Sequence, residues 1–292
     1  MWLRDTYCSF LMLVVALILA TACTEKIDIE LDSTYARLVV EGAVTSDSLN
    51  HYVLLSITSD YFSNKPPPKV QDAVVELSFG NESMQLIEND TIPGRYETPN
   101  AFRGTIGTTY DLDISQLDID QDGQDEIYHS SSTMQGGAEL EKIEIKYYST
   151  PVASGYTVFM YLYHVPEIRE WFGFKLIKNG ILISTSLEQY SVLSDEIFDS
   201  GYFPGFPVGF LSDDESDEAV FPGDTITFEL NCIEQSYYNF VSEAQLELAG
   251  NFPLFSGPPS NVVSNIDNGA MGTFTAYSIQ RYSVILEEAQ KK

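Results

Sequence analysis

The sequence contains few basic side chains. It has 15 lysine and arginine residues against 43 aspartate and glutamate residues, which gives a formal net charge of −28 at pH 7. Proteins that bind nucleic acids need a basic face that contacts phosphates, so this class of protein is excluded. For the same reason we expect no electrostatic docking on an anionic membrane surface.

The apolar run near the N-terminus is short. It extends from Phe10 to Ala20 and has 11 residues, far fewer than the ~20 that a helix needs to span a bilayer. A short apolar run followed by small residues is typical of a secretion signal. The sequence Ala20-Thr21-Ala22-Cys23 resembles the lipobox of bacterial lipoproteins, in which the cysteine receives a diacylglyceryl group. We therefore predict a lipoprotein signal peptide at residues 1–22 and a lipidated tether at residues 23–34. An ordinary cleaved signal followed by a chance cysteine is the alternative.

Cysteine is scarce. Cleavage of the signal would remove Cys8 and lipidation would occupy Cys23, which leaves only Cys232. The mature chain then has no intramolecular disulfide, which excludes the small disulfide-rich scaffolds. Apolar and polar residues alternate from Ile226 to Cys232. We therefore expect Cys232 on the buried face of a β-strand, as a packing residue rather than a nucleophile.

Histidine is equally scarce, and the common catalytic motifs are missing. His51, His129 and His164 share no metal-ligand spacing, and we expect His164 to be a core or rim residue with satisfied hydrogen bonds. The sequence has no nucleophile elbow, phosphate-binding loop or dinucleotide-binding fingerprint. A carboxylate pair for glycoside hydrolysis stays open among the 43 acidic residues, but no pair is singled out. We predict that the protein is not an enzyme.

Most of the remaining chain has a hydrophobic period of two, which is typical of β-strands. The segments with this pattern or with a β-rich apolar run are residues 38–44, 52–58, 70–79, 110–114, 143–147, 156–165 and 174–183. The run at 156–165 is nearly continuous, as in a central strand. The last segment contains Asn179-Gly180, a dipeptide that favours the type I′ turn of a β-hairpin.

One segment has a helical period instead. Apolar residues recur from Tyr237 to Leu248 at the spacing of one helix face, and Ser236 and Gly250 are the expected caps. We predict an all-β protein with two tandem immunoglobulin/transthyretin-like antiparallel β-sandwich domains and one short helix in the C-terminal domain. The boundary is expected near Gly136-Gly137, with domains at residues 35–136 and 137–292.

An acidic hairpin is the candidate metal site. Asp118, Asp120 and Asp122 alternate and precede Gly123, which matches the opening of a calcium-binding loop. The twelfth position should be a bidentate carboxylate, but it is His129. Asp125 and Glu126 could replace it in another geometry. The alternative is a solvated hairpin tip. A second acidic run, residues 213–218, is expected to be a hydrated loop or a diffuse cation site.

An aromatic segment is the candidate recognition loop. Residues 201–210 place four aromatic side chains among prolines and glycines, and we expect neither a regular strand nor a helix there. Rigid aromatic side chains offer a large contact area at low entropic cost, which favours ligand or partner recognition. The alternative is a loop that closes one end of a sandwich. The four residues are Tyr202, Phe203, Phe206 and Phe210.

The order of the motifs resembles a known family. In the N-terminal half, the segments 39–45, 70–77, 94–96 and 109–114 resemble the transthyretin-like and carboxypeptidase-regulatory type of β-sandwich. The C-terminal half adds the segments 195–199, 223–224, 259–265 and 268–274. Together with the lipobox, the chain is similar to the Bacteroidota lipoprotein family called domain of unknown function forty-two forty-nine. Two features depart from that pattern: an apparent insertion at residues 203–221 and a longer, more acidic hairpin at 118–126.

This resemblance implies a place beside TonB-dependent outer-membrane receptors. We therefore expect an outer-membrane lipoprotein that acts as a non-enzymatic accessory or ligand-capture partner of a TonB-dependent receptor in nutrient uptake. Surface exposure is expected rather than a periplasmic location. A surface adhesion or structural β-sandwich module is one alternative, and a calcium-dependent hydrolase is another. Calcium is the single candidate cofactor, and the resemblance supplies no catalytic residue.

Overall fold

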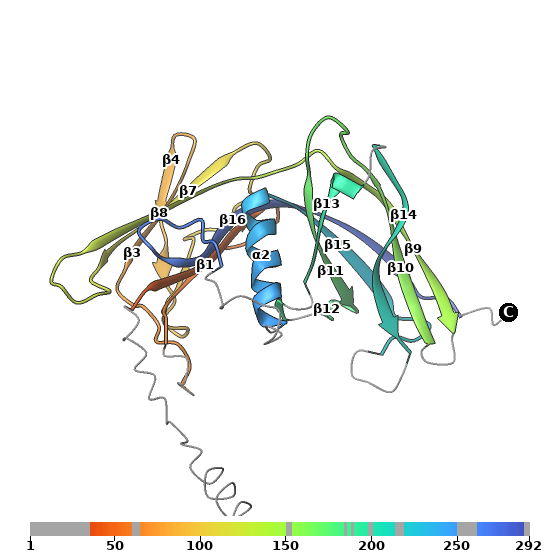
Figure 1. Cartoon of the computed structure of the whole chain (residues 1–292), viewed down its shortest axis with the longest axis horizontal. Helices are drawn as coiled ribbons and strands as arrows, with labels where there is room; N and C mark the ends of the chain where they lie inside the picture. Colours follow the sequence, from red (N-terminus) through yellow and green to blue (C-terminus); the bar gives the residue numbers. More distant parts are fainter. Residues whose placement is uncertain are drawn as a thin grey trace, which may run out of the picture. The chain divides into compact units, whose positions relative to one another are not determined.

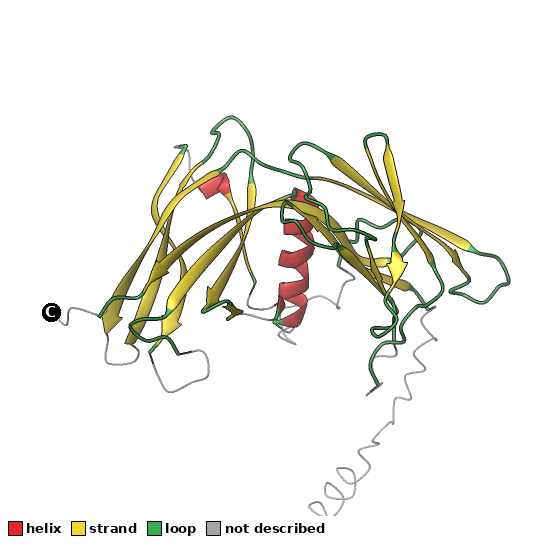
Figure 2. Cartoon of the chain, turned by 180° about the vertical axis from the view of Figure 1, so that it is seen from behind, coloured by secondary structure: helices red, strands yellow, loops and turns green. Residues whose placement is uncertain are grey.

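The structure is a computed structural model that describes residues 36–59, 65–149, 154–183, 186–187, 190–197, 201–213, 219–249 and 262–288. The predicted signal peptide, Cys23, the tether, Gly250 and most of the acidic run at 213–218 lie outside these residues. The described chain is mostly β-strand, with one α-helix, α2 (Gln235–Leu248), and a short 3₁₀-helix, η2 (Asp195–Ile197) (Figure 2). This confirms the predicted all-β class with one helix. Within the same residues, no helix is long and apolar enough to cross a membrane.

The largest sheet has nine strands (Figure 1). Eight of them follow the order β12 (Ile181–Leu182), β11 (Trp171–Lys178), β15 (Thr225–Ile233), β16 (Met271–Ile285), β1 (Leu38–Thr45), β2 (Tyr52–Ile57), β6 (Arg95–Glu97) and β5 (Ile87–Glu88). The ninth strand, β13 (Ser191–Ser194), pairs with β11. Neighbouring strands are antiparallel except β1 and β16, which are parallel. The first half of β16 pairs with β1 and its second half pairs with β15, so this one strand joins the two parts of the sheet.

Two smaller antiparallel sheets complete the fold. One has the order β14 (Tyr202–Ser212), β10 (Ser154–Tyr163) and β9 (Glu139–Ser149). The other has the order β4 (Glu82–Gln85), β3 (Val74–Phe79), β7 (Thr109–Leu117) and β8 (Glu126–Thr133). In each sheet one face carries the apolar residues of the strands. Burying these faces against other elements is what makes a layered β fold stable.

The buried side chains form two clusters. The first contains residues between Leu38 and Met134 together with Ile266, Ala270, Phe274 and Ala276. The second contains residues between Ala138 and Cys232 together with Leu286. Residues before Gly136-Gly137 contribute to the first cluster, and residues after it contribute to the second. The segment from Ile266 to Ala276 then contributes to the first cluster again. The boundary at 136/137 stays a prediction, but the first cluster is completed by residues far beyond that boundary.

The strands follow the hydrophobic pattern closely. Each of the seven predicted segments contains a strand, and β10 is the central strand of its sheet. The hairpin of β11 and β12 turns at Asn179 and Gly180, whose φ angles are +50° and +83°. Positive φ at both central residues is what a type I′ turn requires. The turn prediction is therefore confirmed.

Two local predictions are wrong. Helix α2 begins after Glu234 rather than after Ser236, which lies within its first turn, and the Glu234 side chain makes no capping hydrogen bond. Residues 202–212 form strand β14 instead of an irregular loop. Proline is tolerated there because β14 is an edge strand that pairs only with β10. The pairing shifts register twice, and Gly205 has a φ of +83°, so the strand bends through bulges.

Candidate functional site

A pocket of about 750 Å³ lies on one face of the nine-stranded sheet. Its floor is formed by β1, β2, β16, β15 and β11, and helix α2 contributes Tyr237 and Phe240 to its wall. The helix packs against β11, β13 and β16 (Figure 1). Pockets that bind small molecules typically have volumes of ≈ 300–1,000 Å³ and mostly apolar walls with a few polar groups.

The period-two pattern of the strands separates this pocket from the core. Side chains of a strand point alternately to its two faces. The odd-numbered residues of β1 and β16 face the pocket, whereas Val40 and Phe274, from the even-numbered set, belong to the first core cluster. Parallel pairing places Val39 opposite Met271 and Thr45 opposite Tyr277, so the two strands present one continuous surface. The pocket-facing residues of β16 are Met271, Thr273, Thr275, Tyr277, Ile279 and Arg281.

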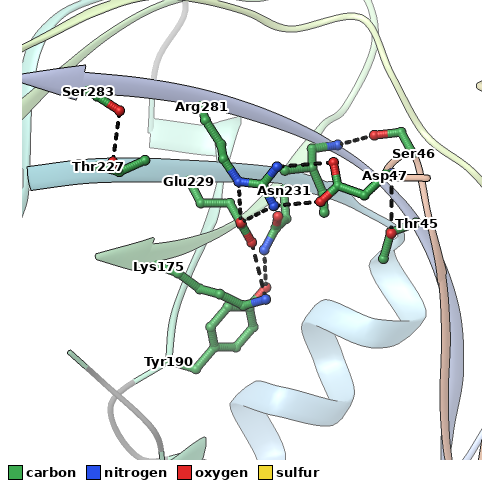
Figure 3. Close-up of polar contacts among 11 residues, drawn as sticks. Thr45, Ser46, Asp47, Lys175, Tyr190, Thr227, Glu229, Asn231, Arg281 and Ser283 are labelled. Carbon is green, nitrogen blue, oxygen red and sulfur yellow. Dashed lines mark hydrogen bonds and ion pairs between the residues drawn. The ribbon is translucent and has the colours of Figure 1, made fainter. Parts of the chain in front are cut away.

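A buried carboxylate organises the polar end of the pocket (Figure 3). Glu229 on β15 is only 4% exposed. Its carboxylate accepts hydrogen bonds from Arg281 Nε at 2.8 Å and lies 2.6 Å from Arg281 Nη2. Lys175 Nζ on β11 lies 3.2 Å from the other oxygen. An ionised carboxylate is tolerated inside a protein only when it is paired in this way.

Arg281 also forms hydrogen bonds with Asp47, in the turn that follows β1. Its Nη1 and Nη2 donate to the two oxygens of Asp47 at 3.0 and 2.6 Å. This hydrogen bond is the main reason why the pKa of Asp47 is lowered and that of Arg281 is raised. The neighbouring Ser46 Oγ accepts from the backbone N–H of Ile279 at 2.8 Å. The four charges of Lys175, Arg281, Glu229 and Asp47 cancel, so this wall of the pocket has no net charge.

Aromatic side chains lie beside these charged groups. The rings of Tyr237 and Tyr277 are nearly parallel, at 9°, with centroids 6.5 Å apart. Lys175 Nζ lies 5.8 Å from the Tyr277 ring centroid and 6.0 Å from that of Tyr190, within the range of cation–π attraction. Burial raises the pKa of all three tyrosines, so they stay neutral at physiological pH.

Two polar atoms near the pocket have no hydrogen-bond partner within the described part of the chain. They are Thr275 Oγ1 and Asn231 Oδ1, and both are buried. Asn231 Nδ2 donates to the Tyr190 hydroxyl at 3.3 Å, whereas Thr275 lines the pocket directly. Buried polar atoms are normally paired. The pocket therefore offers a ligand apolar and aromatic contacts, while the Thr275 hydroxyl in its lining is buried.

The predicted aromatic residues do not line this pocket. Phe203 is fully buried and packs edge to face with Phe172, and Phe206 packs against the second core cluster. The Tyr202 hydroxyl donates to Glu141 at 2.6 Å. Phe210 is 52% exposed. The role of these residues in recognition stays a prediction, but they belong to a strand whose aromatic side chains divide between the core and the surface.

The predicted calcium residues lie at the tip of the β7–β8 hairpin. Oxygens of Asp118, Asp120 and Glu126 lie within 4.8 Å of one another, whereas Asp122 is not part of this group. Asp118 and Asp122 instead accept backbone hydrogen bonds from Gly123 at 3.0 Å and from Gln124 at 2.8 Å. These bonds are the turn chemistry of a solvated hairpin tip. Calcium binding here stays a prediction.

Two other predicted residues have clear positions. Cys232 lies on β15, is 3% exposed, and its burial raises the pKa of the thiol to about 11. This confirms the prediction of a buried strand residue. His164 was expected to have satisfied hydrogen bonds, and this is wrong. The side chain is 1% exposed, but neither ring nitrogen has a hydrogen-bond partner among the described residues.

The pocket could not be predicted from the sequence, because its floor depends on pairing between distant strands. The β-branched and aromatic residues between Thr273 and Ile285 were present in the sequence and could have predicted β16. Nothing local indicated that β16 pairs in parallel with β1, more than 200 residues earlier. The joint role of Glu229 and Arg281 follows only from that sheet order.

A family model described as "Domain of unknown function (DUF4249)" matches residues 24–283. This match covers most of the chain and confirms the family that the order of the sequence motifs predicted. No curated protein matches the chain.

Proposed function

We propose that this chain, which belongs to the family described as domain of unknown function (DUF4249), is a ligand-capture protein that holds a small molecule in the pocket under α2. The pocket carries the proposal. Its volume and its aromatic and apolar walls fit a ligand with an apolar body. Because Glu41 also lines the pocket, beside the four charges that cancel, the ligand should carry no net negative charge.

The proposal also includes a cellular location and a partner protein. The lipobox-like sequence that ends at Cys23 supports attachment to the outer membrane through lipid. The family resemblance supports a non-enzymatic accessory role beside a TonB-dependent receptor in nutrient uptake. In that role the protein captures the ligand at the cell surface and delivers it to the receptor.

The pocket is tested by filling it. We would purify the full chain from membranes and search for a bound small molecule by native mass spectrometry. Thr273→Trp places a large ring in the pocket and should abolish the bound mass. Thr109→Trp is the matched control, because Thr109 is an exposed strand residue outside the pocket. Equal ligand binding by the two variants would contradict ligand capture in this pocket.

The partner is tested separately. The tagged full chain, expressed in its own host, should co-purify with a TonB-dependent receptor from the outer-membrane fraction. The Cys23→Ala variant should be lost from that fraction if lipid anchors the chain. Recovery of the chain without any such receptor argues against the partnership and leaves the pocket experiment unaffected.

A further inference from the structure

Two buried carboxylates and one buried imidazole meet beside the second core cluster. His164 directly follows β10, Glu170 directly precedes β11, and Asp195 begins η2. All three are buried, with side-chain exposures of 1%, 8% and 5%. One ligand atom from each lies within 4.8 Å of the other two. The β10–β11 connection and a short helix therefore place three metal-binding side chains together.

The distances fit shared coordination better than hydrogen bonding. His164 Nδ1 lies 3.6 Å from Asp195 Oδ2 and 4.0 Å from Glu170 Oε2. A hydrogen bond between such atoms would measure about 2.7–3.2 Å. Two ligands that bind one Zn²⁺ at about 2.1 Å in tetrahedral geometry lie about 3.4 Å apart. The observed separations are close to that value.

The His164 imidazole gives a second, independent indication of a bound ion. Both ring nitrogens of His164 are buried and have no hydrogen-bond partner within the described chain. The ring is held in place, because the His164 backbone N–H donates to Gly201 O at 3.0 Å and the ring packs edge to face with Phe203. A buried imidazole that is fixed in this way and directs Nδ1 towards two carboxylates needs a partner between them.

The carboxylates are oriented by neighbouring donors. Glu170 Oε2 accepts from the Val165 N–H, and Asp195 Oδ2 accepts from the Glu170 N–H, each at 3.1 Å. Arg169 Nη1 donates to Asp195 Oδ1 at 3.1 Å. Each carboxylate oxygen has about two lone-pair sites, so Oε2 and Oδ2 each retain one. Such supporting hydrogen bonds are typical of the residues around a metal site.

The backbone at Gly137 lies very close to the Glu170 carboxylate. A Cβ atom on Gly137 would lie 2.7 Å from Glu170 Oε1, and Gly137 has a φ of +131°. Only glycine therefore lets the buried carboxylate come this close to the chain. Among the described residues, Arg169 is the arginine beside these carboxylates, and it is bonded to Asp195. A divalent cation would neutralise the remaining buried charge.

We propose that His164, Glu170 and Asp195 bind one divalent transition-metal ion, with Zn²⁺ as the best fit. One imidazole nitrogen and two carboxylate oxygens suit zinc, whereas calcium prefers six to eight oxygen ligands. A water molecule or a second carboxylate oxygen would complete the tetrahedron. The ion would tie the β10–β11 connection to η2 and so stabilise the second core cluster. This inference is independent of the ligand pocket.

The test is zinc binding by the full chain. The purified protein is stripped with a chelator, and Zn²⁺ is titrated by calorimetry in competition with a chelator of known affinity. We expect about one Zn²⁺ per chain, a rise in melting temperature, and affinity at least ~100-fold weaker in His164→Gln and Asp195→Asn. His129→Gln is the matched control, because exposed His129 Nδ1 lies 3.0 Å from Asp113 Oδ1. It should bind zinc as the unaltered chain does.

Four results would each overturn the proposal. The unaltered chain could fail to bind zinc or could prefer Ca²⁺ to Zn²⁺. His164→Gln could bind zinc as tightly as the unaltered chain does, or binding could be lost only in His129→Gln. Near-ultraviolet circular dichroism shows whether His164→Gln is folded. If it is not, the test uses the isosteric variant Asp195→Asn and the visible absorption spectrum of the Co²⁺-loaded protein. An intense tetrahedral Co²⁺ spectrum in the unaltered chain that Asp195→Asn weakens supports the site. An octahedral spectrum, or one that Asp195→Asn leaves unchanged, refutes it.

Discussion

Arg281 and Asp47 lie 234 positions apart in the sequence and form a two-pronged ion pair, with Nη1–Oδ1 and Nη2–Oδ2 distances of 3.0 and 2.6 Å. The same guanidinium reaches the buried Glu229 (Figure 3). Because Asp47 follows β1 and Glu229 lies on β15, Arg281 connects strands on both sides of β16. It is therefore the polar link between the two parts of the nine-stranded sheet.

Replacing this arginine should be costly. Arg281→Met leaves Glu229 buried with Lys175 as its remaining partner, and we expect a loss of about 2–4 kcal/mol in the free energy of unfolding. Urea denaturation measures the loss. Lys142→Met is the control, because it breaks an exposed pair with Glu144 at 2.7 Å, and exposed pairs contribute little. Similar losses in the two variants would contradict a special role for Arg281.

The acid side of the stability profile should depend on Glu144. Hydrogen bonds from Lys142, Tyr161 and Lys146 lower the pKa of Glu144 from 4.5 to about 2. A lowered pKa in the folded state gives stability that is complete above pH 4.5 and is lost as the pH falls towards 2. Solvent screening keeps this contribution small, because the Glu144 side chain is 35% exposed. Carbon-detected NMR titration should find that midpoint. Lys142→Met should move it upwards, and an unchanged midpoint in this variant would contradict the assignment.

Cys232 should be protected from thiol reagents. Burial raises the pKa of this thiol to about 11, so very little thiolate is present at neutral pH. We expect no labelling of Cys232 in the native protein and complete labelling in guanidinium. Cys232→Ala identifies the part of the signal that belongs to this thiol. The reaction is followed with a chromogenic disulfide reagent. Rapid labelling of the native chain at pH 7 would show that the strand opens easily or that the thiol is accessible.

Two glycines near the start of β16 should differ in their tolerance of a methyl group. Gly272 has a φ of +92°, and a Cβ there would clash with the backbone oxygen of Val40 on β1. Gly269 has a φ of +74°, with no atom within 4 Å of its Cβ position. Gly269→Ala should cost only about 1–2 kcal/mol of backbone strain. Gly272→Ala should cost clearly more, or prevent folding, in thermal denaturation. Equal costs would mean that the β1–β16 contact is looser than the structure shows.

The sequence predicted the elements whose signals are local. The alternation around Ile143 and Ile226, and the turn at Asn179-Gly180, depend on neighbouring residues, and each appears where it was expected. Strand β14 was not predicted because Pro204 and Pro207 normally exclude a strand. Whether an edge strand with bulges can accept them depends on its position in the sheet, which the local sequence does not encode.

The sites were harder to predict than the strands. The pocket requires β1 and β16 to lie side by side, and the cluster of His164, Glu170 and Asp195 requires the β10–β11 connection and a short helix to converge. No spacing along the chain contains that information. The residues that the sequence did single out, such as Asp120 and Phe210, are conspicuous because they cluster locally, and local clusters of this kind are common in turns and edge strands.

The double pairing of β16 also has a consequence for biosynthesis. A ribosome releases β1 and β15 long before Met271–Ile285 emerges, and both strands then expose an unpaired edge. An exposed edge invites aggregation until its partner arrives. We expect the nascent protein to depend on chaperones until β16 pairs with both strands, after which both edges close in one step.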